Sequence, residues 1–433
     1  MKFSRAAKAA ACALTAAALA AGCSSGGSPA ASGSTRKVTL TFWSWVPNMQ
    51  KIVDVWNTSH PDIQVEFTEA AGGDAELAKL LASGKAKDMP DLAQIEYQSL
   101  PTMVSNGYLA DISSYEGNLK SDFPGGLWTQ VTLGTGALYG VPQDAAPLAF
   151  FYRKDIFAKY RLAVPTTWAQ YAQEAEELHK EDPGGYLGDT AATDAGLFAG
   201  LTQQAGAQWW STSGTTWSVG IDSAAAQQVA SFWGGLVQNG SIDSQTAWTA
   251  SWDKSFSSGE YASWIAAVWA PGDLASSAAN TSGDWAMAEL PQWTAGQHVS
   301  GAWGGSATSV TADSRHPQQA AEFIAWLNRS AQGTSLLASD GSVYPASLEA
   351  ESGSALPAQG FMDQPDFYSL AKQYSNQVTP ATWGPDVDVA YSDFGDDFAS
   401  TVRTRSGYLS ALGRLQSSVV SDMKSTGFTV GAS

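Results

Sequence analysis

The chain has 433 residues, and its 23 basic against 41 acidic residues give it a formal net charge of −18. An acidic surface of this size argues against nucleic acid and anionic lipid as partners, and it disfavours highly anionic ligands. The length suffices for a large hydrophobic core and favours two domains.

The N-terminus has the pattern of a secretory signal peptide. Three basic residues lie among the first eight, and residues 9–21 are apolar and Ala-rich but too few to span a bilayer. Residues 19–23 read Leu-Ala-Ala-Gly-Cys, which resembles the bacterial lipobox, whose cysteine is acylated and becomes the new N-terminus. We therefore expect residues 1–22 to be a lipoprotein signal peptide and Cys23 to carry the lipid, on the extracytoplasmic face of the cell membrane. Ordinary secretion with a spare thiol is the alternative.

The segment after the expected signal is rich in Ser, Gly and Ala. Residues 23–36 cannot form a core of their own, so we expect a flexible, lipid-anchored spacer there. Cys12 would leave with the signal peptide and Cys23 would carry the lipid. The mature body would then have no free thiol, disulfide or cysteine-ligated metal.

The body begins with a strand–helix–strand pattern. Apolar residues alternate over residues 38–42 and 63–67, which predicts strands, and residues 52–56 follow helical spacing between them. This order predicts a parallel α/β sheet. A further strand at about residues 91–95 and a helix at about residues 98–106 continue it.

Two later helices have clear start signals. Thr167 and Gln170 form a capping box that predicts a helix beginning at Trp168. Pro317 is placed to open another helix. Its apolar face would be formed by residues at helical spacing, namely Ala320, Phe323, Ile324 and Leu327.

Short motifs then follow one another in an order that is typical of one family. They include Met-Pro-Asp-Leu at residues 89–92, Tyr-Gly-Val-Pro at 139–142, Phe-Tyr-Arg-Lys-Asp at 151–155 and Pro-Thr-Thr-Trp at 165–168. In these motifs and their order, the chain resembles the bacterial extracellular solute-binding proteins of family 1. These are the sugar-binding, maltose-binding-protein-like lipoproteins of ABC transporters.

The resemblance implies an α/β, two-lobed periplasmic-binding-protein-like fold of the class II type, with a ligand cleft between lobes joined by hinge crossings. The N-terminal lobe would comprise residues 37–144 plus 305–350, and the C-terminal lobe residues 145–304 plus 351–433. Ligand would close the lobes by a hinge motion, and the transmembrane subunits of an ABC permease would recognise the closed form. We expect a monomer that binds solute for import and is not an enzyme.

The tryptophan content favours a carbohydrate ligand. The chain has 18 Trp, and 11 of them lie between Trp209 and Trp303, which is more than a core of this size needs. Aromatic rings cover the C–H faces of sugars, and polar side chains pair with the hydroxyls. Several such rings predict a di- or oligosaccharide. By contrast, Trp56, Trp168 and Trp326 lie on helical apolar faces and are expected in the core.

The expected ligand contacts lie at strand ends, at lobe crossings and where the resemblance places stacking rings. A structural role is the alternative for each of them. The set comprises Trp45, Asn48, Glu96, Tyr97, Gln98, Asp144, Trp269, Trp303 and Trp383.

Catalytic and metal-binding patterns are missing from the sequence. The four His have no metal-ligand spacing, and no nucleophile elbow, Walker loop or zincin motif occurs. The acidic residues between positions 386 and 397 lack the order of an EF-hand loop. We therefore expect no catalytic residue, metal or cofactor. Two alternatives stay open: a binding protein for a polyamine, ion or cofactor, and a secreted glycoside hydrolase, which would need a carboxylate pair across a sugar site.

Overall fold

The computed structural model describes residues 37–431 except 116, 191, 352–355 and 357–358. The expected signal peptide, Cys23 and the rest of the spacer all lie outside the described residues. Among those described, no helix combines the length and the apolar composition that crossing a membrane requires.

The first sheet has five strands in the order β2-β1-β3-β10-β4. β1 is parallel to β2 and β3, which confirms the strand–helix–strand prediction, and Val38 pairs with Ile63 in register. β10 is antiparallel to both of its neighbours, so the sheet is mixed and not fully parallel as predicted. The strands are β1 (Val38–Ser44), β2 (Ile63–Glu69), β3 (Leu92–Glu96), β4 (Val141–Asp144) and β10 (Ser306–Val310).

Helices cover this sheet, and the sequence predicted those near residues 52–56, 98–106 and 317–327. α1 (Met49–Ser59) packs on β2, and its buried face includes Ile52, Val53 and Trp56. α11 begins at Pro317 as predicted and packs on β10 and β4. Besides α1, the helices around the sheet are α2 (Gly73–Ala86), α3 (Leu100–Ser105), α4 (Gly125–Thr132), α11 (Pro317–Arg329), α12 (Ala331–Ser339) and α13 (Leu348–Glu351).

A second sheet is built on β5 (Leu148–Arg153), which pairs antiparallel with β8 (Ser263–Ala267) on one side and β9 (Trp285–Ala288) on the other. The predicted capping box opens α6 (Trp168–Glu181): the Thr167 side chain accepts from the Gln170 amide, and the Gln170 side chain accepts from the Thr167 amide. The nearby helices are α5 (Lys154–Tyr160), α9 (Ala250–Ser258), α10 (Ala270–Ser277) and α14 (Phe367–Ser375).

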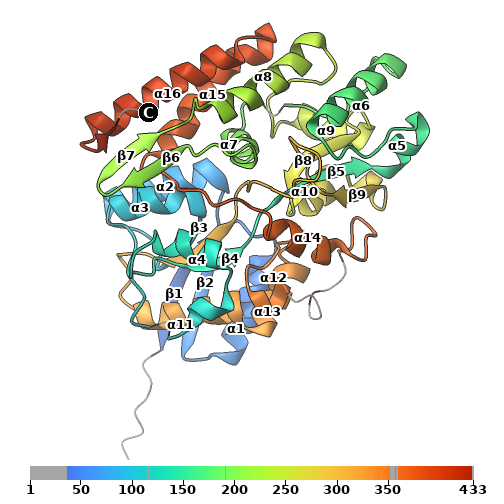
Figure 1. Ribbon diagram of the computed structural model, residues 1–433. Coiled ribbons are helices and arrows are strands. Elements are labelled where there is room, and N and C mark those ends of the chain that lie inside the picture. Colours follow the sequence, from blue (N-terminus) through green and yellow to red (C-terminus); the bar gives the residue numbers. More distant parts are fainter. Residues whose placement is uncertain (1–36, 116, 191, 352–355, 357–358, 432–433) are drawn as a thin grey trace, which may run out of the picture. The chain divides into compact units, whose positions relative to one another are not determined.

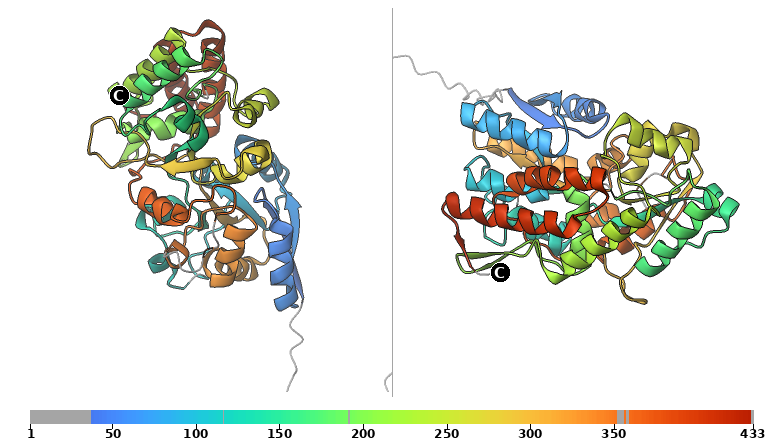
Figure 2. Two further views of the ribbon diagram at one scale, coloured as in Figure 1. Left: turned by 90° about the vertical axis from the view of Figure 1, so that its right-hand side faces the viewer. Right: turned by 90° about the horizontal axis from the view of Figure 1, so that it is seen from above.

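Long helices gather at the end of the molecule away from the first sheet. α16 packs against α15 and α8, and Figures 1 and 2 show these helices at the opposite end from α1 and α11. A small sheet lies beside them, in which β7 pairs with β6 and β11. These elements are α7 (Ala195–Gln204), β6 (Trp210–Ser213), β7 (Thr216–Val219), α8 (Ala224–Asn239), α15 (Val387–Thr404), α16 (Tyr408–Ser425) and β11 (Thr429–Val430).

Three chain segments run side by side between the first and second sheets. Ala145 N–H donates to Tyr344 O at 3.0 Å, and Trp303 N–H donates to Ala146 O at 3.0 Å. The segment that holds Trp303 leads directly into β10, so this strand enters the first sheet from the side of the second sheet. The antiparallel direction of β10, which local periodicity could not reveal, follows from this entry.

Candidate functional site

A cavity of about 710 Å³ lies where strand ends of the first sheet face α7, α10 and α15; we call it the cleft cavity. β1 and β3 are parallel, so the residues that follow them reach the same edge of the sheet. β10 is antiparallel, so its first residue, Ser306, reaches that edge too. The topology therefore brings together side chains that are far apart in sequence.

Six of the predicted contacts line the cleft cavity. They lie at or just after the ends of β1, β3 and β4, at the N-cap of α10 and in the segment before β10. They are Trp45, Glu96, Gln98, Asp144, Trp269 and Trp303.

Three predicted contacts lie outside this lining. The Asn48 side chain donates to the carbonyl of Asp340 at 3.0 Å, at the N-terminus of α1. Tyr97 turns inward in a single 3₁₀ turn, and its buried hydroxyl donates to a backbone carbonyl at the end of β4. Trp383 packs on Trp210 of β6, with the ring centroids 6.2 Å apart. Asn48 and Trp383 are thus held by neighbours outside the lining, whereas Tyr97 lies beneath the floor and bonds to the backbone of Asp144.

Sequence reasoning missed five other lining side chains that bear a carboxylate or an aromatic ring. Asp74 lies in the first turn of α2, Asp194 caps α7, and Trp248 precedes α9. Only Trp248 had a signal in the sequence, because it lies in the Trp-rich stretch. The full set is Asp74, Asp194, Trp248, Asp273 and Tyr391.

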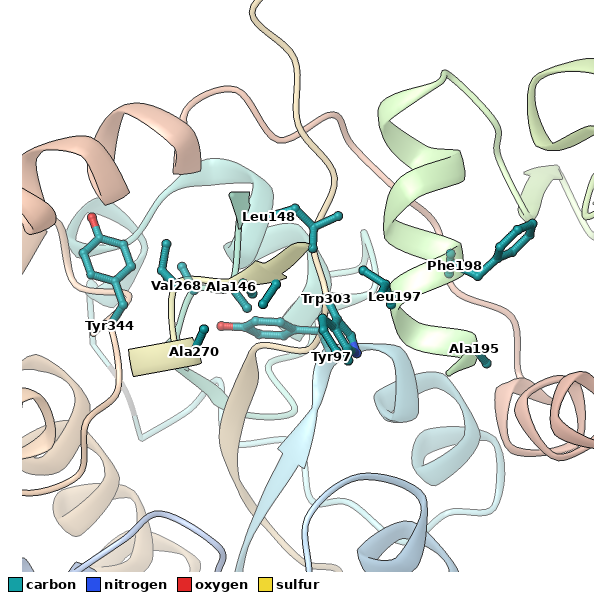
Figure 3. Close-up of a cluster of buried hydrophobic side chains, with 14 of the residues drawn as sticks. Tyr97, Ala146, Leu148, Ala195, Leu197, Phe198, Val268, Ala270, Trp303 and Tyr344 are labelled. Atoms are coloured by element: carbon teal, nitrogen blue, oxygen red, sulfur yellow. The ribbon is translucent and has the colours of Figure 1, made fainter. Parts of the chain in front are cut away.

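Aromatic rings form one wall of the cavity. The Trp269 and Trp303 rings meet edge to face at a centroid distance of 4.8 Å, and the Trp269 indole N–H donates to Trp303 O at 3.0 Å. Trp264 is buried behind Trp269 at 5.6 Å. Figure 3 shows Trp303 among apolar side chains that include Ala146 of the crossing and Leu197 of α7. The wall is therefore backed by core packing and presents fixed ring surfaces.

A hydrogen-bond network fixes the polar floor of the cavity. The Gln94 side chain accepts from the Ser44 hydroxyl at 2.7 Å and donates to the Ser306 hydroxyl at 2.8 Å. Asp144 accepts from both the backbone N–H and the hydroxyl of Ser306. These bonds join the ends of four strands, so the positions of the floor side chains are fixed by bonds within the protein itself.

The turn between Trp303 and β10 borders the cavity and contains two glycines. Gly304 and Gly305 have φ values of +78° and +84°, a region that favours glycine. A Cβ on Gly305 would lie 3.0 Å from the Tyr97 ring. The turn between Trp303 and β10 therefore requires glycine for both conformation and space.

All ionisable groups in the described lining, apart from a tyrosine, are carboxylates, and no Lys, Arg or His lies among them. The carboxylates belong to Asp74, Glu96, Asp144, Asp194 and Asp273. Burial raises the pKa of Glu96 to about 8, and repulsion from Asp74, Asp194 and Asp144 adds to this. Burial also raises the pKa values of Asp144, Asp194 and Asp273 to about 6. The cavity can accept hydrogen bonds from hydroxyl or ammonium groups, and it repels anions.

Known proteins resemble this chain in sequence or in structure. A lipoprotein of unknown function from Streptomyces antibioticus is 33% identical over 180 residues, which cover 39% of this chain and 38% of that protein. The binding protein from B. animalis subsp. lactis, solved with beta-1,6-galactobiose, superposes with a TM-score of 0.83 at 25% identity, covering 92% of this chain and all of that one. The Bifidobacterium longum protein solved with lacto-N-biose gives a TM-score of 0.82 at 27% identity, covering 91% and 99%.

These superpositions confirm the two-lobed α/β fold that the sequence resemblance implied. The family model that describes bacterial extracellular solute-binding proteins matches residues 43–334, about two thirds of the chain. Members of that family bind solutes and are not enzymes. The chain therefore belongs to the family of bacterial extracellular solute-binding proteins.

Proposed function

We propose that the protein is the sugar-binding component of an ABC importer and holds a di- or oligosaccharide in the cleft cavity. The observation that carries this proposal is the presence of tryptophan rings and hydrogen-bond acceptors together in the lining of one cavity of about 710 Å³. That volume falls within the roughly 300–1,000 Å³ of small-molecule sites. Two similar proteins were solved with disaccharides, which supports the same ligand class here.

The chemistry of the lining suits a neutral sugar. Trp269 is only partly buried and offers an apolar ring surface for C–H groups, and the buried Trp303 ring packs edge to face against it. Asp144 and Glu96 offer acceptors for hydroxyl donors, which would otherwise be left unpaired on burial at considerable cost. Since the described lining has no cationic side chain, a sugar phosphate or a uronic acid would meet repulsion with no compensating charge.

We propose that the two predicted lobes are the units that move when the cleft closes. In this proposal residues 37–144 plus 305–350 close on residues 145–304 plus 351–433. The membership of the strands supports it: all five strands of the first sheet come from the former set, and the three of the second sheet from the latter. A monomer closed on sugar would then dock on the permease and release its ligand.

We also propose a lipid on Cys23 that holds the protein at the extracytoplasmic face of the membrane. The lipobox-like sequence and the lipoprotein from Streptomyces antibioticus support this. Cys23→Ala should move the protein from the membrane fraction into the medium while leaving sugar binding intact. Full retention of the variant in the membrane fraction would contradict the lipid anchor.

Isothermal titration calorimetry of the mature protein tests the ligand class. The panel should hold beta-1,6-galactobiose, lacto-N-biose, lactose, maltotriose, glucuronic acid, glucose 6-phosphate and spermidine. We expect saturable binding of at least one neutral di- or oligosaccharide and none of the two anions. If spermidine were the only compound to bind, the ligand class would be a cation and not a sugar. Appearance of monosaccharide products on long incubation would contradict a binding role.

A further inference from the structure

Trp248 is unusual among the large apolar side chains of the described residues. It is 52% exposed, the highest value for such a residue in this part of the chain, and it lines the cleft cavity. Its backbone has φ +61°, in the left-handed region that bulky residues avoid. An exposed indole on a strained backbone raises the free energy of the folded state, so packing alone does not explain it.

The side chain of Trp248 is nevertheless held in place. Its indole N–H donates to Asp194 Oδ2 at 2.8 Å, and Asp194 Oδ1 accepts from the Leu197 amide at 2.9 Å as the N-cap of α7. Asp194 thus joins the indole to the first turn of a buried helix. The orientation of the ring is fixed although half of its surface is exposed.

One side of Trp248 packs on other tryptophans. Its ring centroid lies 5.2 Å from Trp252, 5.8 Å from Trp303, 6.1 Å from Trp269 and 6.2 Å from Trp264. We call these five side chains the indole cluster. Because Trp248 packs on this cluster, is 52% exposed and lines the cleft cavity, its ring lies at the edge of the cavity. The half-exposed ring is held by a hydrogen bond on a strained backbone, and at the edge of the cavity it can pack against a flat apolar surface of a ligand.

We propose that Trp248 is the principal sugar-stacking platform of the cleft cavity, and that Asp194 is the positioning residue that holds it. The inference rests on the proposed function and specifies the ligand further. The preferred sugar would be a pyranose whose C–H groups gather on one face, so that the ring can lie against the indole. Linear polyols and polyamines lack such a face.

Calorimetry with beta-1,6-galactobiose, lacto-N-biose and lactose tests this inference. Trp248→Ala should weaken the binding of the preferred disaccharide roughly 10- to 100-fold, because covering an aromatic side chain by ligand contributes one to two factors of ten. Trp248→Gly tests the same loss with a residue that suits φ +61°. Trp248→Phe should retain part of the affinity.

Trp217→Ala is the matched control. This half-buried tryptophan on β7 lies outside the cavity and packs on Phe428 at 6.4 Å. The control should lower the melting temperature and leave the affinity unchanged.

A double-mutant cycle tests the role of Asp194. Asp194→Ala should weaken binding in the wild type but have little further effect in Trp248→Ala, since both changes remove the same platform. Equal effects in both backgrounds would mean that Asp194 binds sugar independently of Trp248. If wild type binds sugar and both Trp248→Ala and Trp248→Gly stay within threefold of it, the inference is wrong while the proposed function stands. If wild type binds no sugar of the panel, the proposed function itself is wrong.

Discussion

Replacing Glu96 by Gln should stabilise the protein at alkaline pH and leave its stability unchanged at acidic pH. Glu96 ends β3, and its Oε2 accepts from the Gln98 side chain at 2.7 Å. The Gln oxygen in Glu96→Gln can accept the same bond. The substitution therefore removes a charge and keeps the local hydrogen bonding.

The magnitude follows from the pKa of Glu96, which burial and three neighbouring carboxylates raise from 4.5 to about 8. Between these two values the folded protein holds a proton that the unfolded chain has released, so the free energy of unfolding falls as the pH rises. At 1.36 kcal/mol per pH unit the full loss would be about 5 kcal/mol. Water in the open cavity screens the charge, so we expect a loss of about 1–3 kcal/mol.

Urea denaturation of wild type and Glu96→Gln at pH 4, 6 and 8.5 measures this effect. The two free energies of unfolding should agree at pH 4, diverge at pH 6 and differ most at pH 8.5, with the variant more stable. Glu69→Gln, at the exposed end of β2, reports what the loss of one surface carboxylate does by itself. Parallel pH profiles for wild type and Glu96→Gln would refute the reasoning.

Three further substitutions test packing and binding. Gly301→Ala would place a Cβ 1.8 Å from the Gly200 carbonyl oxygen, so it should cost about 3 kcal/mol or more in urea denaturation, and a smaller loss would show that this contact relaxes easily. Gly235→Ala, in α8 with open space around it, should instead stabilise by up to about 1 kcal/mol; a loss would contradict the helix-propensity argument. Trp269→Ala should weaken sugar binding roughly tenfold in calorimetry, and unchanged affinity would remove Trp269 from the ligand contacts.

The parts of the fold that could be predicted from sequence are those that local forces determine. Alternation along residues 38–42 and the reciprocal cap at Thr167 depend on neighbours within a few residues, and both are confirmed. The direction of β10 depends on where a distant segment crosses between sheets, so periodicity could not provide it. Family motifs supplied the order of the elements that local patterns left undetermined.

The candidate site was predicted less well, for a geometric reason. Strand-end positions identified Trp45, Glu96 and Asp144 because parallel strands bring their carboxyl ends together. Tyr97 is one residue beyond Glu96, but a single 3₁₀ turn directs it inward. Trp248 bonds to a carboxylate 54 residues away on a backbone that no tryptophan prefers, so no short sequence pattern marks it.

The crowding of the indole cluster has an optical consequence. The centroids of neighbouring rings in the cluster are 4.8–6.3 Å apart. At these distances, excitation energy absorbed by one indole passes readily to its neighbours before emission. Light absorbed by buried Trp252 or Trp264 would therefore be emitted in part from the exposed Trp248 ring. A solute that covers that one ring would change the emission of all five, which gives the protein an intrinsic spectroscopic reporter for occupancy of its cavity without an added dye.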